Sequence, residues 1–298
     1  SILMSDSDSG NITNSTDAVT FIGDTGFQLG DNGEGTQALE LNKNGNSYVC
    51  WNWYAGGSSA NFNKDGVGYS SAADVPGLAA NTASVTTNKC SIGTKQGFSI
   101  INYTLSTGSQ SIGHGLDQVP EVSLAKCINA QTDWYFRIKT LDGVLNGYII
   151  LNGTAGITGS FSPTATQVSA AYTSGTQNWI AYNWHSVPGF LKIGTFTGNN
   201  NGDGPYVDLG FKPAMVLLKR HDGSGDWVLW DNKRNPSNPV NRQVWPYTSS
   251  GTYGAYDQVG ANYPIDFLSN GFKMRSNDAD INGAHGYFYM AWAETPSF

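Results

Sequence analysis

The sequence predicts an all-β protein made of tandem antiparallel modules of the β-sandwich or jelly-roll type. Apolar and polar residues alternate in 133–139 (DWYFRIK) and 226–231 (DWVLWD), which is the period of a half-buried strand. Glu and Met, two strong helix formers, occur only four times each. Turn-forming stretches such as 199–204 (NNNGDG) separate the apolar runs, and long-range internal repetition indicates modules.

Residues 97–188 and 189–298 share one order of features, which predicts two complete β modules. Both begin with Gly-Phe, continue through a short strand, a Thr/Gly/Asn turn, a Pro and an apolar run that ends in Lys, and close on an aromatic stripe. In both, a Trp follows that Lys by eight positions, in the pairs Lys126–Trp134 and Lys219–Trp227. Self-similarity of this length is the signature of tandem repeats.

Residues 1–59 are predicted to be the closing part of a preceding β module. The Gly-Phe run at 26–29 (GFQL) precedes a stripe at 48–53 (YVCWNW), as GFKM precedes the last stripe of the chain. The start at Ser1 also suggests a piece of a longer chain. Residues 60–96 are rich in Gly, Ser, Ala and Asn, so we expect a linker or long surface loop there.

The recurring aromatic stripe has two interpretations. Its copies are YVCWNW at 48–53, WIAYNW at 179–184 and YFYMAW at 287–292. Flat indole rings beside amides such as Asn52 suit sugar binding, whereas the same rings fill the centre of a β-sandwich equally well. Because the stripe returns at the same place in every module, the sequence favours a core strand.

Charge and cysteine content exclude several classes of function. The net charge of −7 offers no basic surface for a phosphate backbone, so we expect no nucleic-acid partner. Cys50, Cys90 and Cys127 are odd in number and lack CxxC spacing, which argues against a disulfide framework or a zinc site. We expect Cys50 and Cys127 to be buried free thiols. No apolar run approaches 18 residues, so we expect no membrane insertion.

One stretch resembles half of a calcium loop. Asp278, Asp280 and Asn282 are followed by Gly283, but Tyr289 stands where the bidentate Glu of such a loop belongs. A polar β-turn is favoured over a metal site, and we expect no cofactor.

Enzyme motifs are missing. The four His are scattered without HExxH spacing, and no GxSxG marks a nucleophile elbow. Asp133 and Asp226, which could serve a glycosidase, occupy one repeat position before a Trp and suggest strand starts. We therefore expect a protein that is not an enzyme.

The inserted loop 235–264 is the candidate binding region, because no stretch of similar length occurs in the first module. It carries the candidate binding residues Arg242, Trp245, Tyr247, Tyr253 and Tyr256. Tyr-rich loops on a rigid β scaffold suit adaptable recognition. An insertion that covers a sheet edge or makes a subunit contact explains the loop equally well.

The motifs resemble an uncharacterised repeat domain of virion proteins of marine tailed bacteriophages, notably cyanophages. The resemblance rests on YVCWNW, GFSIINYT (97–104) and GHGLDQVPEVSLAKC (113–127), and above all on 189–220 and 266–294. It extends from about residue 20 to the end and is closest over 189–296. It carries no known catalytic or ligand residues.

The resemblance implies a virion component exposed outside the host cell, most simply a tail fibre or appendage that recognises a host receptor or glycan. It also implies self-association, with a homotrimer expected, and contacts with other virion proteins. A capsid-decorating or purely structural tail protein is the first alternative. A carbohydrate-binding or polysaccharide-degrading β-sandwich protein is the second.

Overall fold

The computed structural model confirms the all-β fold class. It describes residues 3, 5, 7–9, 19–22, 26–29, 45, 47–82, 84–170, 175–247, 256–259 and 263–296. The described residues form 21 strands and one three-residue 3-10 turn, η1 (Ala72–Asp74). No helix in this part of the chain is long and apolar enough to cross a membrane.

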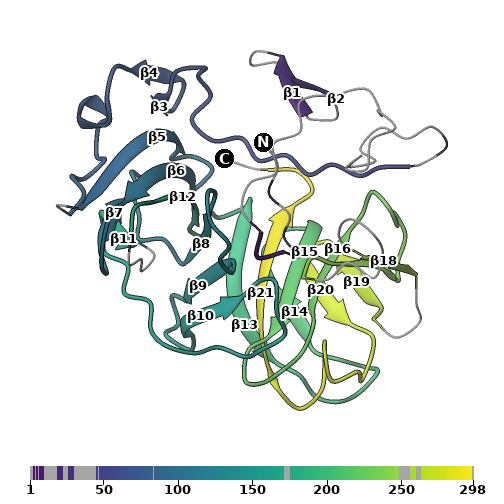
Figure 1. Ribbon diagram of the computed structural model, residues 1–298. Coiled ribbons are helices and arrows are strands. Elements are labelled where there is room, and N and C mark those ends of the chain that lie inside the picture. The colour runs from purple at the N-terminus through teal and green to yellow at the C-terminus, as the bar shows by residue number, and fades with distance from the viewer. Residues whose placement is uncertain are drawn as a thin grey trace.

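The first large sheet has eight strands in the order β10-β9-β8-β12-β6-β5-β3-β4 (Figure 1). Its strands are β3 (Phe62–Lys64), β4 (Val67–Tyr69), β5 (Val85–Gly93), β6 (Phe98–Leu105), β8 (Val122–Cys127), β9 (Tyr135–Lys139), β10 (Asn146–Ile150) and β12 (Gln177–Trp184). A two-stranded sheet of β7 (Ser111–Gly113) and β11 (Gln167–Ser169) accompanies it.

The second large sheet has six strands in the order β13-β21-β15-β16-β17-β18. Its strands are β13 (Leu191–Thr197), β15 (Pro213–Arg220), β16 (Trp227–Asp231), β17 (Arg242–Trp245), β18 (Tyr256–Val259) and β21 (Gly286–Ala293). Its companion sheet contains β14 (Tyr206–Asp208), β19 (Ile265–Leu268) and β20 (Gly271–Met274). A separate hairpin pairs β1 (Val19–Ile22) with β2 (Gly26–Leu29).

The two repeats have the same strand order. The series β6-β12-β8-β9-β10 of the first repeat returns as β13-β21-β15-β16-β17 in the second. The second and third aromatic stripes form β12 and β21, each paired on both sides with antiparallel strands. The sequence repeat is therefore a repeat of topology with the stripe inside each sheet.

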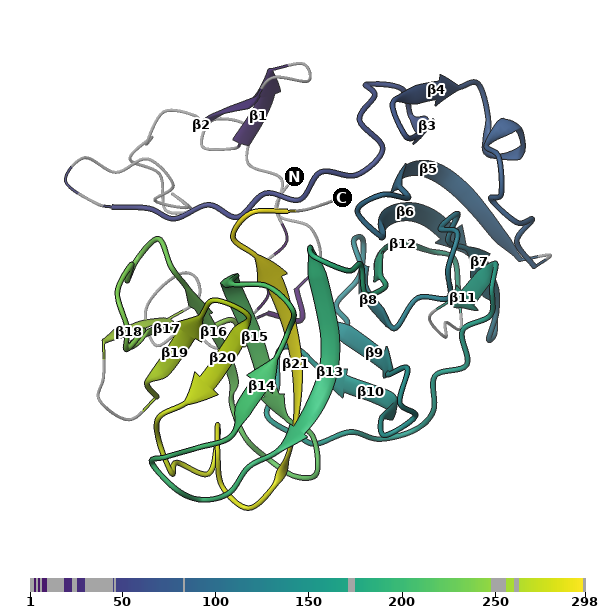
Figure 2. The same cartoon turned by 180° about the vertical axis from the view of Figure 1, so that it is seen from behind.

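The two large sheets pack face to face and share one apolar core (Figures 1 and 2). Phe136 on β9 meets Trp227 on β16 with ring centroids 4.8 Å apart, and it also meets Phe288 on β21 at 5.7 Å. Trp227 Nε1 donates a hydrogen bond to the carbonyl of Ile150 across the same interface. We call this region the shared core.

A second apolar core covers the outer face of each large sheet. In the first repeat, Ile112 and Val168 of the small sheet pack against β6, β8 and β12. In the second repeat, Phe272 and other residues of β14, β19 and β20 pack against β15, β16 and β21. Each repeat is thus its own sandwich, and the large sheets are covered on both faces. This explains why β21 is almost continuously buried.

The segment 60–96, for which the sequence predicts a linker or surface loop, differs from that expectation. It contains β3, β4, η1 and the nine-residue β5, which pairs along β6. The register shifts between Thr87 and Lys89, so a bulge interrupts the alternation of buried side chains. That interruption hides the period of two on which strand prediction depends.

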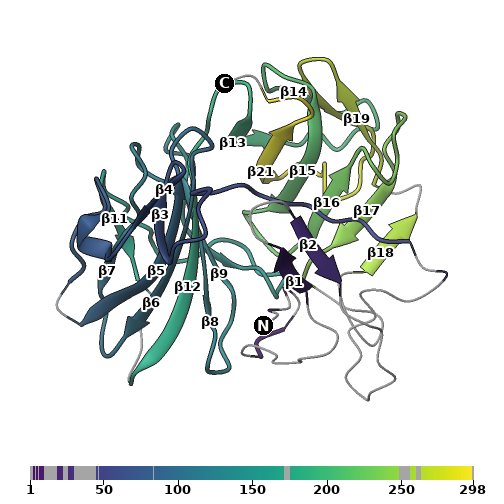
Figure 3. The same ribbon diagram turned by 90° about the horizontal axis from the view of Figure 1, so that it is seen from above.

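The first copy of the stripe also differs from the predicted core strand. Residues 47–57 form no strand and cross the two repeats as an extended segment, which we call the strap (Figures 1 and 3). Cys50 on the strap is exposed, so its predicted burial is wrong, whereas Cys127 in β8 is buried as expected. The hairpin β1–β2 does repeat the pairing of β19 with β20.

The repeated Lys at the end of each apolar run is fully buried. Lys126 Nζ donates to the carbonyls of Thr132 and Asp8, and Lys219 Nζ donates to those of Thr154 and Arg220. Burial lowers the pKa of both ammonium groups, that of Lys219 to about 8. These lysines tie loops to the strand ends.

The shared core predicts that one substitution destabilises both repeats. Trp227→Ala removes a fully buried ring that contacts the opposite sheet, so the free energy of unfolding should fall by about 3–5 kcal/mol. Urea unfolding followed by circular dichroism should still show one transition. Leu141→Ala is the control, because Leu141 is 79% exposed. Two separate transitions, or no loss of stability, would contradict a common core.

His114 predicts loss of stability in mild acid. The ring is fully buried, accepts a hydrogen bond from the N–H of Leu116 at Nδ1, and lies 3.3 Å from the carbonyl of Thr164 at Nε2. Burial lowers its pKa from 6.5 to about 4. The unfolded chain therefore binds this proton below about pH 6.5 and the folded chain only near pH 4, so stability falls across that window.

The loss that His114 contributes between pH 6.5 and pH 4 is about 3 kcal/mol. Urea unfolding of the wild type and of His114→Gln at both pH values measures it. The variant should show a shallower pH dependence, whatever its stability at pH 7. Equal slopes for the two proteins would show that His114 does not carry the effect.

Candidate functional site

The structure places the described candidate binding residues on the last two strands of the second sheet and in the turn after β17. Arg242 and Trp245 belong to β17, and Tyr247 lies in the turn that follows. Tyr256 lies in β18, but its side chain and the whole of Tyr253 are outside the described residues. Residues 242–245 and 256–259 of the inserted loop thus add two strands to the sheet.

The described aromatic side chains of this loop are engaged in packing. Trp245 is half-buried and meets Tyr263 edge to face at 6.1 Å. The hydroxyl of Tyr247 donates a 2.6 Å hydrogen bond to Asp226, whose carboxyl pKa is raised by burial. These contacts fasten β17 to the body of the repeat.

The calcium-loop candidates form a hydrogen-bonded turn. Asp278 accepts a hydrogen bond from the N–H of Asp280. Asp280 in turn accepts from the N–H of Asp226 and the hydroxyl of Tyr263. Buried Asn282 is hydrogen-bonded to Asn199, Asn201 and Ser276. Within the described part of the chain, no three His, Cys, Asp or Glu residues lie together as metal ligands would.

The strap is anchored at two points, one on each repeat. The N–H of Gly56 donates to Ser91 Oγ of β5, and a Cβ at Gly56 would collide with the side chain of Asn63. On the second repeat, the guanidinium of Arg234 lies 5.7 Å from the ring centroid of Trp51 and forms an ion pair with buried Asp231. The strap therefore bridges the end of the shared core.

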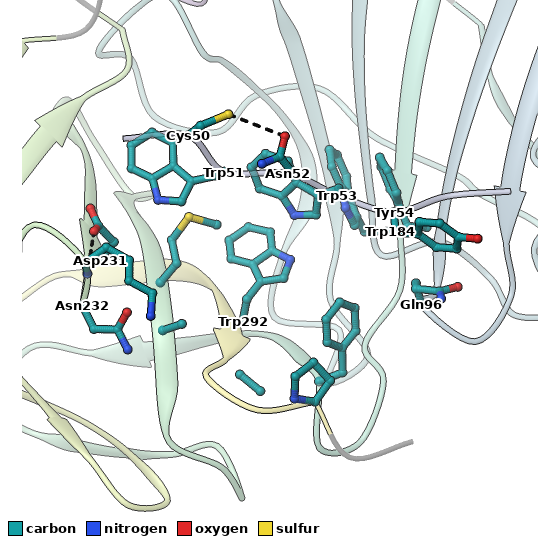
Figure 4. A pocket seen from close by; sticks show the side chains of 17 residues that line it. Cys50, Trp51, Asn52, Trp53, Tyr54, Gln96, Trp184, Asp231, Asn232 and Trp292 are labelled. Atoms are coloured by element: carbon teal, nitrogen blue, oxygen red, sulfur yellow. Dashed lines mark hydrogen bonds between the residues drawn. The ribbon is translucent and has the colours of Figure 1, made fainter. Parts of the chain in front are cut away.

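A cavity of about 480 Å³ lies beneath the strap, between the two repeats (Figure 4). Its lining is aromatic and amide-rich: Cys50, Trp51, Asn52, Trp53, Tyr54, Gln96, Phe98, Trp184, Phe190, Ala214, Met215, Asp231, Asn232, Lys233, Trp292, Ala293 and Pro296. Asp231 and Asn232 lie at the opposite end from Tyr54 and Gln96. We call this space the aromatic cavity.

Equivalent tryptophans from all three copies of the stripe meet at the aromatic cavity. Trp53, Trp184 and Trp292 are the last residues of the three stripes. Trp53 meets Trp292 edge to face at 5.8 Å, and Trp184 stacks on Phe98 at 4.9 Å. A second space of about 430 Å³, lined mainly by apolar residues of the shared core, shares these tryptophans.

Four polar atoms of the lining are buried and have no hydrogen-bond partner among the described residues. Three are indole donors, Nε1 of Trp51, Trp184 and Trp292, and the fourth is an acceptor, Oδ1 of Asn232. Asn232 uses its Nδ2 to donate to Glu294. The lining residues thus combine aromatic surface with both kinds of hydrogen-bonding group.

Asp231 is the one carboxylate among the lining residues, and its oxygens are already occupied. It pairs with Arg234 and accepts hydrogen bonds from the backbone N–H groups of Lys233 and Arg234. The chemistry available to the buried part of this lining is stacking and hydrogen bonding by neutral groups, and the exposed Lys233 is the cation among the lining residues.

One family model matches residues 1–296. The chain belongs to the family described as a domain of unknown function, DUF7483. No curated protein and no solved structure matches it.

The sequence contains part of the information that locates the aromatic cavity, namely the Trp that ends each stripe. The stripes align Trp53 with Trp184 and Trp292, but alignment does not show that the repeats face each other. Asn232 follows the Asp-Trp-Val-Leu-Trp-Asp run, and no sequence motif identifies it as a site residue.

The structure predicts that Tyr247 acts mainly on stability. Tyr247→Phe keeps the ring but leaves the half-buried Asp226 without its hydroxyl donor, so the free energy of unfolding should fall by about 1–2 kcal/mol. Tyr206→Phe is the matched control, because its hydroxyl also faces an Asp but on an exposed surface. Chemical denaturation compares the two. Equal losses would show that the Tyr247 contact is no stronger than a surface contact.

Proposed function

We propose that this chain is a non-enzymatic component of a bacteriophage virion, a tail fibre or related appendage that takes part in recognition of a host-surface receptor or glycan. The aromatic cavity carries the recognition part of this proposal, because it is concave, held between two packed sheets and lined by aromatic rings with unused hydrogen-bonding atoms. The sequence resemblance to phage virion repeats supports the virion part.

Binding is favoured over hydrolysis by the carboxylates of the cavity. Glycoside hydrolysis ordinarily needs two convergent carboxyl groups. The lining supplies Asp231 alone, and that group is held by Arg234. A polysaccharide-degrading activity would thus lack its acid and base pair at this site.

A structural role in the virion is the second candidate, and exposed apolar side chains favour it. Four exposed aromatic side chains belong to residues 26–54: Phe27, Tyr48, Trp53 and Tyr54. Apolar surface of this kind often marks a contact with another chain. A homotrimer or a neighbouring virion protein would cover it, and several copies would raise the avidity of a weak binder.

The proposed function predicts two results with the phage that encodes the chain. Antibodies against the purified chain should label intact virions at the tail or another appendage in electron micrographs.

Excess purified chain should slow adsorption of the phage to its host, because it occupies the same receptors. The heat-unfolded chain is the control.

Labelling without competition would favour the purely structural alternative. Failure of the antibodies to label any virion surface would contradict the proposal. Release of oligosaccharides from host polysaccharide would instead point to a depolymerase.

A further inference from the structure

We infer that the aromatic cavity binds a neutral saccharide, with the indole N–H groups of Trp51, Trp184 and Trp292 donating to its oxygens and Asn232 Oδ1 accepting from one of its hydroxyls. This inference deepens the proposed function, on which it rests, by naming the site and the ligand class.

The unused hydrogen-bonding atoms decide the ligand class. Trp184 and Trp292 are each 8% exposed and Asn232 is 9% exposed, so bulk water satisfies their polar atoms poorly. A buried polar atom without a partner costs about 1–3 kcal/mol. A hydroxyl group both donates and accepts, so a polyol is a ligand that can pair with indole donors and with an amide acceptor alike. Ionised carboxylate groups and aliphatic chains have no hydrogen to donate to Asn232 Oδ1.

Clustering matters more than the lack of a partner alone. Trp179, in the outer core of the first repeat, also has an unpaired N–H among the described residues. By contrast, Trp227 and Trp230 donate to the carbonyls of Ile150 and Tyr263. Three unpaired donors and one unpaired acceptor around a single cavity require an explanation that an isolated buried indole does not.

The shape of the cavity suits a sugar ring. Pyranoses present flat C–H faces, and the indoles of Trp53 and Trp292 supply apolar surface at an angle of 67° to each other. The volume of about 480 Å³ lies within the range of roughly 300–1,000 Å³ found for small-molecule sites. Trp53 is 39% exposed, so the strap forms a lip that a ligand can reach from solvent.

The charges argue for a neutral sugar over an acidic one. Arg234, the half-buried cation that lies over Trp51 of the strap, is paired with Asp231. Lys233 lines the cavity but is exposed, so solvent weakens any pairing it makes with an anion. Removal of the Lys233 ammonium therefore separates the two ligand classes.

The test uses the purified full chain and isothermal titration calorimetry. The probes are glucose, galactose, mannose and N-acetylglucosamine with their disaccharides, with glucuronate as an acidic sugar and decanoate as an aliphatic anion. At least one neutral sugar should bind, with quenching or a shift of tryptophan fluorescence, and glucuronate should bind no better than its neutral counterpart.

Three variants locate the site. Trp53→Ala removes a stacking ring outside the strands and should weaken binding at least tenfold. Trp292→Phe keeps a ring but removes one N–H, and should weaken binding about two- to tenfold. Lys233→Ala should change it less than twofold. Tyr206→Ala, which removes an exposed aromatic ring from β14, is the matched control and should bind as the wild type does.

The outcomes separate this inference from the proposed function. If the chain competes with phage adsorption but binds no neutral sugar, or keeps its affinity in Trp53→Ala, the cavity assignment is wrong and the virion role stands. If the variants lose sugar binding, but antibodies against the chain do not label virions and the chain does not compete with adsorption, the cavity assignment stands and the virion role is wrong. Binding of decanoate more tightly than any neutral sugar would indicate an aliphatic ligand. Loss of binding in Lys233→Ala would indicate an anionic ligand. Either result would contradict the neutral saccharide. Thermal unfolding shows whether each variant keeps its fold. If Trp292→Phe does not fold, Trp53→Ala still tests the site, because Trp53 lies outside the strands.

Discussion

The structure depends on the face-to-face packing of two homologous sheets. Because β12 and β21 are central strands with apolar layers on both sides, each must place large side chains on both faces. The contacts of Phe136 with Trp227 and Phe288 join the repeats through the side chains that fill each repeat. A sandwich that shares its inner layer cannot shift one repeat without opening the core of the other.

The strap and the aromatic cavity follow from where that shared core ends. Each large sheet already contains its own copy of the stripe, as β12 or β21. The copy at 48–53 therefore has no sheet to join. The strap instead lies across the two strand ends, fixed by Gly56 to the first repeat and by Arg234 to the second. The space beneath it is bounded by the residues with which the repeats terminate.

Much of the fold could be predicted from the sequence, because the internal repeat and the short apolar runs between turn residues mark the strands. The alternation in β9 and β16 predicts strands but not their burial, since both faces of the large sheets are covered. The missed elements have specific physical causes. A bulge at Thr87 breaks the alternation of β5, and the strap has a strand-like sequence without strand neighbours. Aromatic composition makes Trp245 and Tyr247 candidate binding residues. The sequence does not show that Trp245 packs on Tyr263 or that the Tyr247 hydroxyl is hydrogen-bonded to Asp226.

The site was harder to predict than the fold because it depends on convergence of three distant segments. If the aromatic cavity binds a saccharide, as we infer, the two interpretations of the stripe, core strand or sugar platform, describe different residues of one motif. Its inner positions, such as Trp179, Ala181 and Met290, lie within the packed cores. Its final Trp, as Trp184 or Trp292, belongs to the shared core and also lines the aromatic cavity, and a Phe there would fill space without an unsatisfied N–H. The polar edge of Trp184 and Trp292 is therefore unfavourable for an empty core and favourable for one that receives an oxygen-rich ligand.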